Sequence, residues 1–130
     1  ILRQEILATG KKFLHVHGGY LPKYKGSTTN YYSLIDEETI GASSIILSEE
    51  IDCGPVIRRQ RFEPPQRRNY IDHVYDSAAR ARVLMETLKE WCGKGKWSME
   101  IEENRDGDTY YVIHPVLKHL AILGGNNKSK

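Results

Sequence analysis

His15 and His17, two histidines separated by a single residue, are the side chains of this sequence best placed to do chemistry. They end an apolar run, residues 13–17, which a Gly18-Gly19 pair interrupts. In a strand, side chains two residues apart point to the same face, so both imidazoles should converge on one point. Because open α/β sheets bind ligands where their strands end, we expect a site there. An imidazole can carry a proton, donate a hydrogen bond or bind a metal.

A carboxylate in a later loop could complete this site. Residues 48–55 read Ser-Glu-Glu-Ile-Asp-Cys-Gly-Pro and show no hydrophobic period, which predicts a loop. Asp52 lies within it and could accept a proton from a substrate. Each feature alone has an ordinary interpretation, Asp52 as a turn residue and the histidines as structural residues at a strand edge. A metal-dependent hydrolase built on the two histidines and Asp52 also stays open, although a zinc site needs a further ligand and an oriented outer shell.

The elements that would position these residues alternate between strand and helix. The sequence predicts strands at residues 13–17, 42–47 and 56–62, and helical periodicity predicts helices at 28–36 and 71–92, with a short one before Gly10. We expect the three strands to share one sheet with the two longer helices packed on it, in an α/β fold. The sheet should be mixed rather than purely parallel, because the loop at 48–55 is too short for a crossover helix.

The carboxyl-terminal part is typical of a hairpin extension. Residues 97–103 and 109–114 flank an Asp106-Gly107 pair, and Asp-Gly between such runs predicts a β-hairpin. A lone hairpin needs its apolar face covered, so we expect it to join two copies of the chain as a homodimer, or else to pack on Trp91. Residues 115–123 should form a short apolar turn or helix, and 124–130 a disordered tail.

Composition excludes few function classes. The chain has 130 residues, of which 39% are hydrophobic and 28% charged, with a net charge of +2. This favours one ordinary domain and gives little reason to expect nucleic acid as a partner. Cys53 and Cys92 lie far apart without a Cys-x-x-Cys pattern, so a reduced, cytoplasmic setting is expected. No apolar run reaches membrane-spanning length, and the start lacks a signal-peptide pattern.

Two motifs in a fixed order resemble the folate-dependent formyltransferases. His17 is followed by Leu-Pro-Lys-Tyr-Lys-Gly at residues 21–26, and Gly41 and a strand precede Ile-Asp-Cys-Gly-Pro-Val-Ile at residues 51–57. That family includes methionyl-tRNA formyltransferase, glycinamide ribonucleotide transformylase and sugar-nucleotide N-formyltransferases. The resemblance covers about residues 1–61. Where the family pattern reads Asn-x-His-Pro-Ser, this chain has His15 at the Asn position and Gly18-Gly19 at Pro-Ser.

The resemblance implies an enzyme that moves a formyl group from 10-formyltetrahydrofolate to a primary amine, without a metal. His17 would donate a hydrogen bond to the developing oxyanion, Asp52 would accept a proton from the amine, and His15 would assist His17. The folate would contact the predicted loop, at Ser48, Glu49, Glu50, Ile51 and Gly54. The amine pocket would comprise Gly18, Gly19, Tyr20, Leu21, Lys23, Lys25 and Gly26.

The resemblance also implies part of a Rossmann-like mixed sheet, with residues 1–92 as a catalytic domain whose amino-terminal half is missing and 93–123 as the hairpin extension. An amino sugar nucleotide is the first expected acceptor. Methionyl-tRNA is the alternative, because little chain after residue 92 could grip a tRNA. A non-catalytic remnant or assembly module stays open as well.

Overall fold

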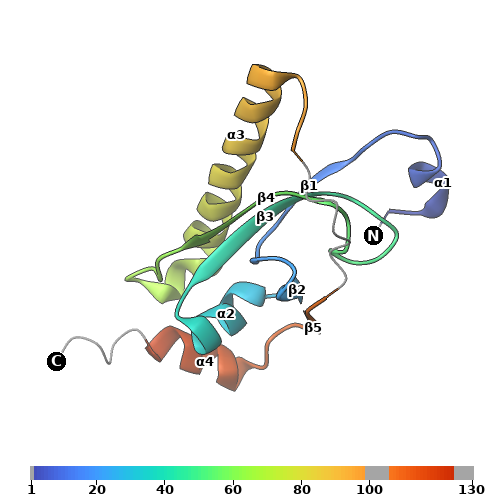
Figure 1. The fold of residues 1–130 in the computed structure, drawn as a ribbon. Coiled ribbons are helices and arrows are strands. Elements are labelled where there is room, and N and C mark those ends of the chain that lie inside the picture. Colours follow the sequence, from blue (N-terminus) through green and yellow to red (C-terminus); the bar gives the residue numbers. More distant parts are fainter. Residues whose placement is uncertain (1, 99–105, 125–130) are drawn as a thin grey trace.

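Three strands in one sheet form the centre of the molecule (Figure 1). The computed structural model describes residues 2–98 and 106–124. Strands β1 (Leu14–His17), β3 (Ile40–Ile46) and β4 (Val56–Phe62) pair in the order β1-β3-β4, so β1 and β4 are the edges of this sheet. The prediction that these segments share one sheet of an α/β fold is confirmed. Both pairings in this sheet are antiparallel; parallel pairing occurs in a second, two-stranded sheet.

The two faces of the sheet separate the core from the histidines. Val16 of β1 pairs with Ser44 of β3, and this face packs against helix α3 (Asp76–Lys94), where the Ser44 hydroxyl lies 2.8 Å from the buried Thr87 hydroxyl. Because strand side chains alternate, His15 and His17 lie on the opposite face. Helix α3 also confirms the long helix that was predicted at residues 71–92. It is preceded by a 3₁₀ turn (η1, Arg68–Tyr70) and a π-helical turn (η2, Ile71–Tyr75).

Helix α2 (Thr29–Glu37) follows the loop after β1 and packs on β3. Thr28 stands at its N-cap position, but in the left-handed region at φ 52°, and its side chain makes no capping bond. The Thr28 hydroxyl instead accepts a hydrogen bond of 2.9 Å from the Ile113 amide. The start of α2 is thereby tied to the carboxyl-terminal segment.

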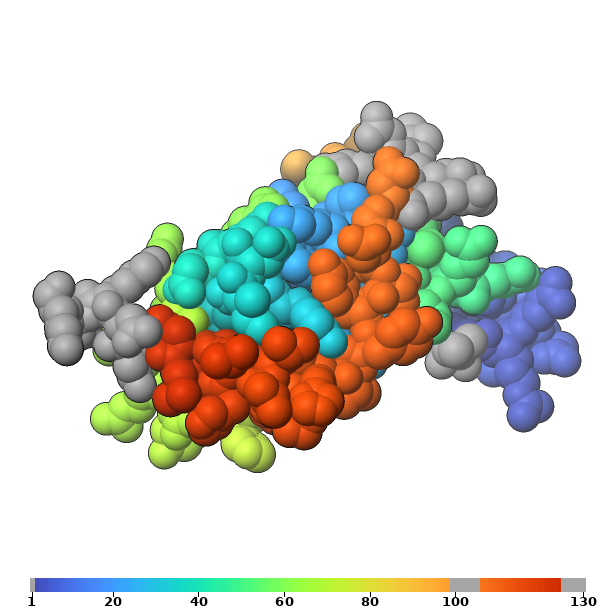
Figure 2. Space-filling view, turned by 90° about the horizontal axis from the view of Figure 1, so that it is seen from below, coloured from blue at the N-terminus to red at the C-terminus, as the bar shows by residue number. Residues whose placement is uncertain are grey.

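The carboxyl-terminal segment returns to the amino-terminal half. Strand β5 (Asp108–Tyr110) pairs in parallel with β2 (Tyr24–Gly26). Helix α4 (Pro115–Leu123) packs beside α2, as Figure 2 shows with α4 in red and α2 in cyan. The predicted hairpin strand at 97–103 falls mostly on residues 99–105, outside the described residues, as does the tail at 125–130. Trp97 packs on Trp91 with ring centroids 4.5 Å apart, which is the intramolecular alternative for this part of the chain.

The short helix expected before Gly10 is α1 (Gln4–Leu7). Within the described ranges, no helix combines the length and the apolar character needed to span a membrane.

Candidate functional site

The end of β1 and the loop after β3 bring three ionisable side chains together. Ligand-type atoms of His15, His17 and Asp52 all lie within 4.8 Å of one another. Asp52 adopts φ 54°, a left-handed conformation that aspartate tolerates better than most residues. Its Oδ2 atom accepts a 2.8 Å hydrogen bond from the Gly26 amide. The loop at 48–55 thus folds back over the strand end.

His17 is held by a hydrogen bond that also fixes its protons. Its Nε2 atom lies 2.7 Å from the Tyr24 carbonyl oxygen. A carbonyl can only accept, so Nε2 carries the hydrogen and donates it. The other ring atom, Nδ1, then faces Asp52 Oδ2 at 3.5 Å. His17 and Asp52 are 6% and 9% exposed, so this pair is largely shielded from water.

His15 differs from His17 in its electrostatic setting. Burial lowers the pKa of His15 below 6.5, against the opposing effect of the Asp52 carboxylate, and the His17 imidazole lowers it further. His15 is therefore neutral at pH 7 and can donate a hydrogen bond from one ring nitrogen and accept with the other.

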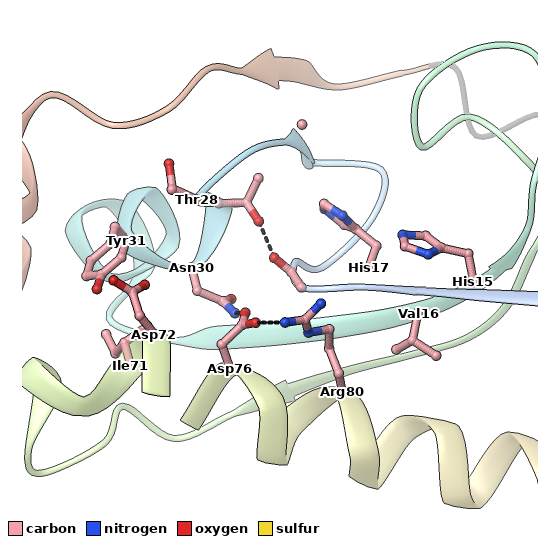
Figure 3. Close-up of a pocket in the computed structure, with 13 residues that line it drawn as sticks. His15, Val16, His17, Thr28, Asn30, Tyr31, Ile71, Asp72, Asp76 and Arg80 are labelled. Atoms are coloured by element: carbon pink, nitrogen blue, oxygen red, sulfur yellow. Dashed lines mark hydrogen bonds and ion pairs between the residues drawn. The ribbon is translucent and has the colours of Figure 1, made fainter. Parts of the chain in front are cut away.

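A cavity of about 260 Å³ opens on one side of the two histidines. Figure 3 shows His15 and His17 on one side of β1 and Val16 on the other, toward α3, with Asp76 and Arg80 rising from that helix. An ion pair of 2.5 Å joins Asp76 to Arg80. Asp72, also in the lining, binds Lys118 at 2.6 Å. Burial works to raise the pKa of Asp72, but its hydrogen bonds with Lys118 and Tyr31 lower it overall.

A second cavity, of about 290 Å³, adjoins the same cluster. His15 and Asp52 border it, together with Leu2 and residues 47–51. Ser48, Glu49, Glu50 and Ile51, which the sequence indicated for the folate, all lie in this lining. Gly54 does not, because it packs on the end of β3, where an added Cβ would collide with the Ile46 carbonyl.

The structure distributes the residues expected in the amine pocket. Gly18 and Gly26 line the first cavity. Leu21 lies in a small core with Ile45 and Val56, and Lys25 is buried in β2. The remaining three lie outside that lining as well: Gly19 packs against His17, Tyr20 lies under the Arg61 guanidinium, and Lys23 pairs with Asp36 and Glu37.

Other lining residues were missed from the sequence. The Asn30 side chain accepts a 2.8 Å hydrogen bond from the Gly41 amide and donates one of 2.8 Å to Asp76. It thereby joins α2, β3 and α3 at the cavity. The four-residue spacing of Asp76 and Arg80 was the available signal, but it equally describes a solvent-exposed helix face. Gly18 faces the same carboxylate, since a Cβ there would clash with Asp76 Oδ1.

Sequence comparisons extend over part of known enzymes. No protein-family model matches the chain. It is 33% identical over 92 residues to a methionyl-tRNA formyltransferase of Gloeothece citriformis, covering 68% of this chain and 27% of that protein. It is 29% identical over 85 residues to formyltetrahydrofolate deformylase 2, mitochondrial, of Arabidopsis thaliana, covering 64% of this chain and 26% of that protein. The chain thus spans about a quarter of the length of these curated relatives.

Solved structures share the fold at low identity. The formyltransferase PseJ from Anoxybacillus kamchatkensis, in complex with UDP-4,6-dideoxy-4-formamido-L-AltNAc and tetrahydrofolate, matches with a TM-score of 0.70 at 18% identity, over 86% of this chain and 59% of that one. HypX from Aquifex aeolicus, in complex with tetrahydrofolic acid, matches with a TM-score of 0.69 at 15% identity, over 100% of this chain and 25% of that one. In sequence and in fold, the chain is identified as a relative of the folate-dependent formyltransferases, matching part of their length.

Proposed function

We propose that this chain carries the reacting centre for transfer of a formyl group from 10-formyltetrahydrofolate to a primary amine. The observation that supports this most directly is the position of His15, His17 and Asp52 between two cavities. A transfer reaction needs donor and acceptor to meet at one point, and a pair of cavities that share a polar boundary provides such a point. A curated relative named methionyl-tRNA formyltransferase supports this reaction type, and one named formyltetrahydrofolate deformylase supports formyltetrahydrofolate as the formyl donor.

The second cavity fits the formyl donor. Its wall combines the apolar side chains of Leu2, Leu47 and Ile51 with His15 and Asp52. Such a wall suits the flat ring system of a folate whose formyl group points toward His15 and Asp52. Leu2 and the loop at 47–51 would hold the folate, which supplies an activated formyl carbon bound to nitrogen.

The acceptor amine would enter the first cavity. Asp72 and Asp76 line it, each paired with a cation, Lys118 and Arg80 respectively, and their carboxylate oxygens can accept hydrogen bonds from an incoming amine. The amine must lose a proton before or during attack, and Asp52 is the carboxylate closest to the histidines. As the new C–N bond forms and the old one breaks, the acceptor loses one proton and the leaving folate nitrogen gains one.

His17 would stabilise the charge that develops on the formyl oxygen. With Nε2 donating to Tyr24, the hydrogen available for this purpose is one on Nδ1, beside Asp52. His15, neutral at pH 7, would add a second hydrogen bond from the boundary between the cavities.

The acceptor that we favour is an amino sugar nucleotide, because structures with this fold include PseJ with its UDP-linked formamido sugar and a 4-N formyltransferase from Francisella tularensis. Methionyl-tRNA is the second candidate, supported by curated relatives that carry that name. We also retain a homodimer and a cytoplasmic setting in the proposal. Cys53 and Cys92 are both free thiols, and the exposed Tyr111 and Val112 could join two copies.

The test measures formyl transfer from 10-formyltetrahydrofolate to each acceptor class. His17→Ala should lower kcat by roughly 100- to 1000-fold, as expected for loss of a well-placed oxyanion donor. Asp52→Asn keeps the shape but removes the proton acceptor, so its loss of turnover should far exceed its loss of stability. His15→Asn should be tolerated far better than either. His119→Asn, on the exposed part of α4, is the matched control, and unchanged transfer in Asp52→Asn would refute the assignment.

A further inference from the structure

His17 and Asp52 place two atoms of metal-ligand type next to each other. Because Nε2 is committed as a donor to the Tyr24 carbonyl, neutral His17 places the Nδ1 lone pair 3.5 Å from an Asp52 oxygen. An imidazole lone pair and a carboxylate oxygen that face the same point can both coordinate one metal cation.

From this geometry we infer that His15, His17 and Asp52 form a binding site for a divalent transition-metal cation such as Zn²⁺ or Co²⁺. The inference goes beyond formyl transfer, which requires no metal. Two imidazoles and one carboxylate are the donor set such cations favour.

The spacing of the ligand atoms is close to what a cation requires. With metal–ligand bonds of about 2.1 Å, tetrahedral ligand atoms lie roughly 3.4 Å apart. The His17 and Asp52 atoms are already 3.5 Å apart. All three ligand atoms lie within 4.8 Å of one another, so a small rotation of the His15 ring would complete the set.

The groups around the ligands orient them as metal sites usually require. A metal-bound histidine typically donates its other N–H to a carbonyl or carboxylate, and the Tyr24 carbonyl receives that hydrogen from His17 at 2.7 Å. The Gly26 amide fixes Asp52 Oδ2 by a 2.8 Å hydrogen bond. His17 and Asp52 are therefore positioned before any cation arrives, which reduces the entropic cost of binding.

The cluster also leaves room for further ligands. It borders cavities of about 260 and 290 Å³, so water or a substrate oxygen can fill the remaining coordination positions. A cation at this place would occupy the nitrogen that formyl transfer needs as a hydrogen-bond donor. Metal binding and transfer should consequently exclude each other.

The test is titration of the full 130-residue chain with Co²⁺ in the absence of folate, followed by the visible absorption of bound Co²⁺ and by calorimetry. Wild type should bind one Co²⁺ and give the intense bands of a low-coordinate site, and Zn²⁺ should displace it. His15→Asn and Asp52→Asn should each weaken binding at least about 10-fold. His119→Asn, at an exposed histidine, should bind as wild type does.

Circular dichroism of each variant without metal checks that the fold is intact. The inference is overturned if wild type binds no stoichiometric Co²⁺, if binding survives both His15→Asn and Asp52→Asn, or if it is lost in His119→Asn, which would indicate surface histidines. Because the Co²⁺ titration uses neither folate nor amine, its failure would refute the metal site without bearing on formyl transfer, which the transfer assay tests independently.

Discussion

Gly19 offers a way to disturb the site without touching any group that does chemistry. A Cβ at this position would lie 2.7 Å from His17 Nε2, 2.7 Å from Thr29 Oγ1 and 2.8 Å from the Tyr24 carbonyl oxygen. Comfortable contacts begin near 3.5 Å, so each of these atoms would have to retreat by roughly 0.7 Å. The backbone of Gly19 is outside the left-handed region, and Gly19→Ala therefore acts by the methyl group alone.

The methyl group would separate His17 from Tyr24. Their hydrogen bond is 2.7 Å long, and a retreat of this size on either side takes it beyond the ~3.2 Å at which such bonds remain good. Loss of a buried hydrogen bond lowers the free energy of unfolding by about 1–3 kcal/mol. Misplacing a catalytic group by about 1 Å can also cost on the order of 100-fold in rate.

Gly93→Ala is the control, because a Cβ there meets nothing within 4 Å and the residue lies near the end of α3. It should stabilise the chain by up to about 1 kcal/mol through helix propensity. Urea denaturation of both variants, the NMR signal of the His17 Nε2 hydrogen and the formyl-transfer rate are the measurements. If Gly19→Ala has the same free energy of unfolding, the same His17 NMR signal and the same transfer rate as wild type, the steric reasoning is refuted.

Two further predictions concern acidity and assembly. Because burial lowers the pKa of His15 below its ordinary 6.5, the unfolded chain binds the proton more readily, so the free energy of unfolding should fall as the pH drops below 6.5 and level off below the folded pKa. Denaturation between pH 8 and 4 should show this component in wild type and not in His15→Asn; identical curves would contradict it. Tyr111 and Val112 are 81% and 75% exposed, so Val112→Asp should shift a wild-type dimer toward monomer in sedimentation velocity, and a wild type that is already monomeric would exclude the dimer.

Two elements were predicted from the sequence with the bounds that the structure shows. The third strand was expected at residues 56–62 and is found there, and the helix beginning at Pro115 follows its apolar pattern to Leu123. Strand β2 was not predicted, and β5 was expected only as part of a hairpin strand at residues 109–114. Both strands are three residues long, and their parallel pairing joins segments far apart in the sequence. No local pattern can report such a contact.

The candidate site was predicted unevenly for a similar reason. His15 and His17 share a face because strands alternate, which follows from sequence alone. The approach of Asp52 was suggested by the family resemblance rather than by any local signal. Asn30 and Asp76 stand on helices where polar residues usually face solvent, and only the packing of α2 and α3 around Gly18 turns them toward the cavity. Lys25, expected in the amine pocket, is buried in β2 instead.

The two edges of the central sheet differ in how well they resist further pairing. Strand β4 carries Arg58, Arg59 and Arg61, and charged side chains of this kind discourage another strand from adding to an edge. Strand β1 reads Leu-His-Val-His and has no such guard. Any additional strand, from another segment or another copy, would therefore extend the sheet on the β1 side, and the backbone that carries both histidines would become an interior strand.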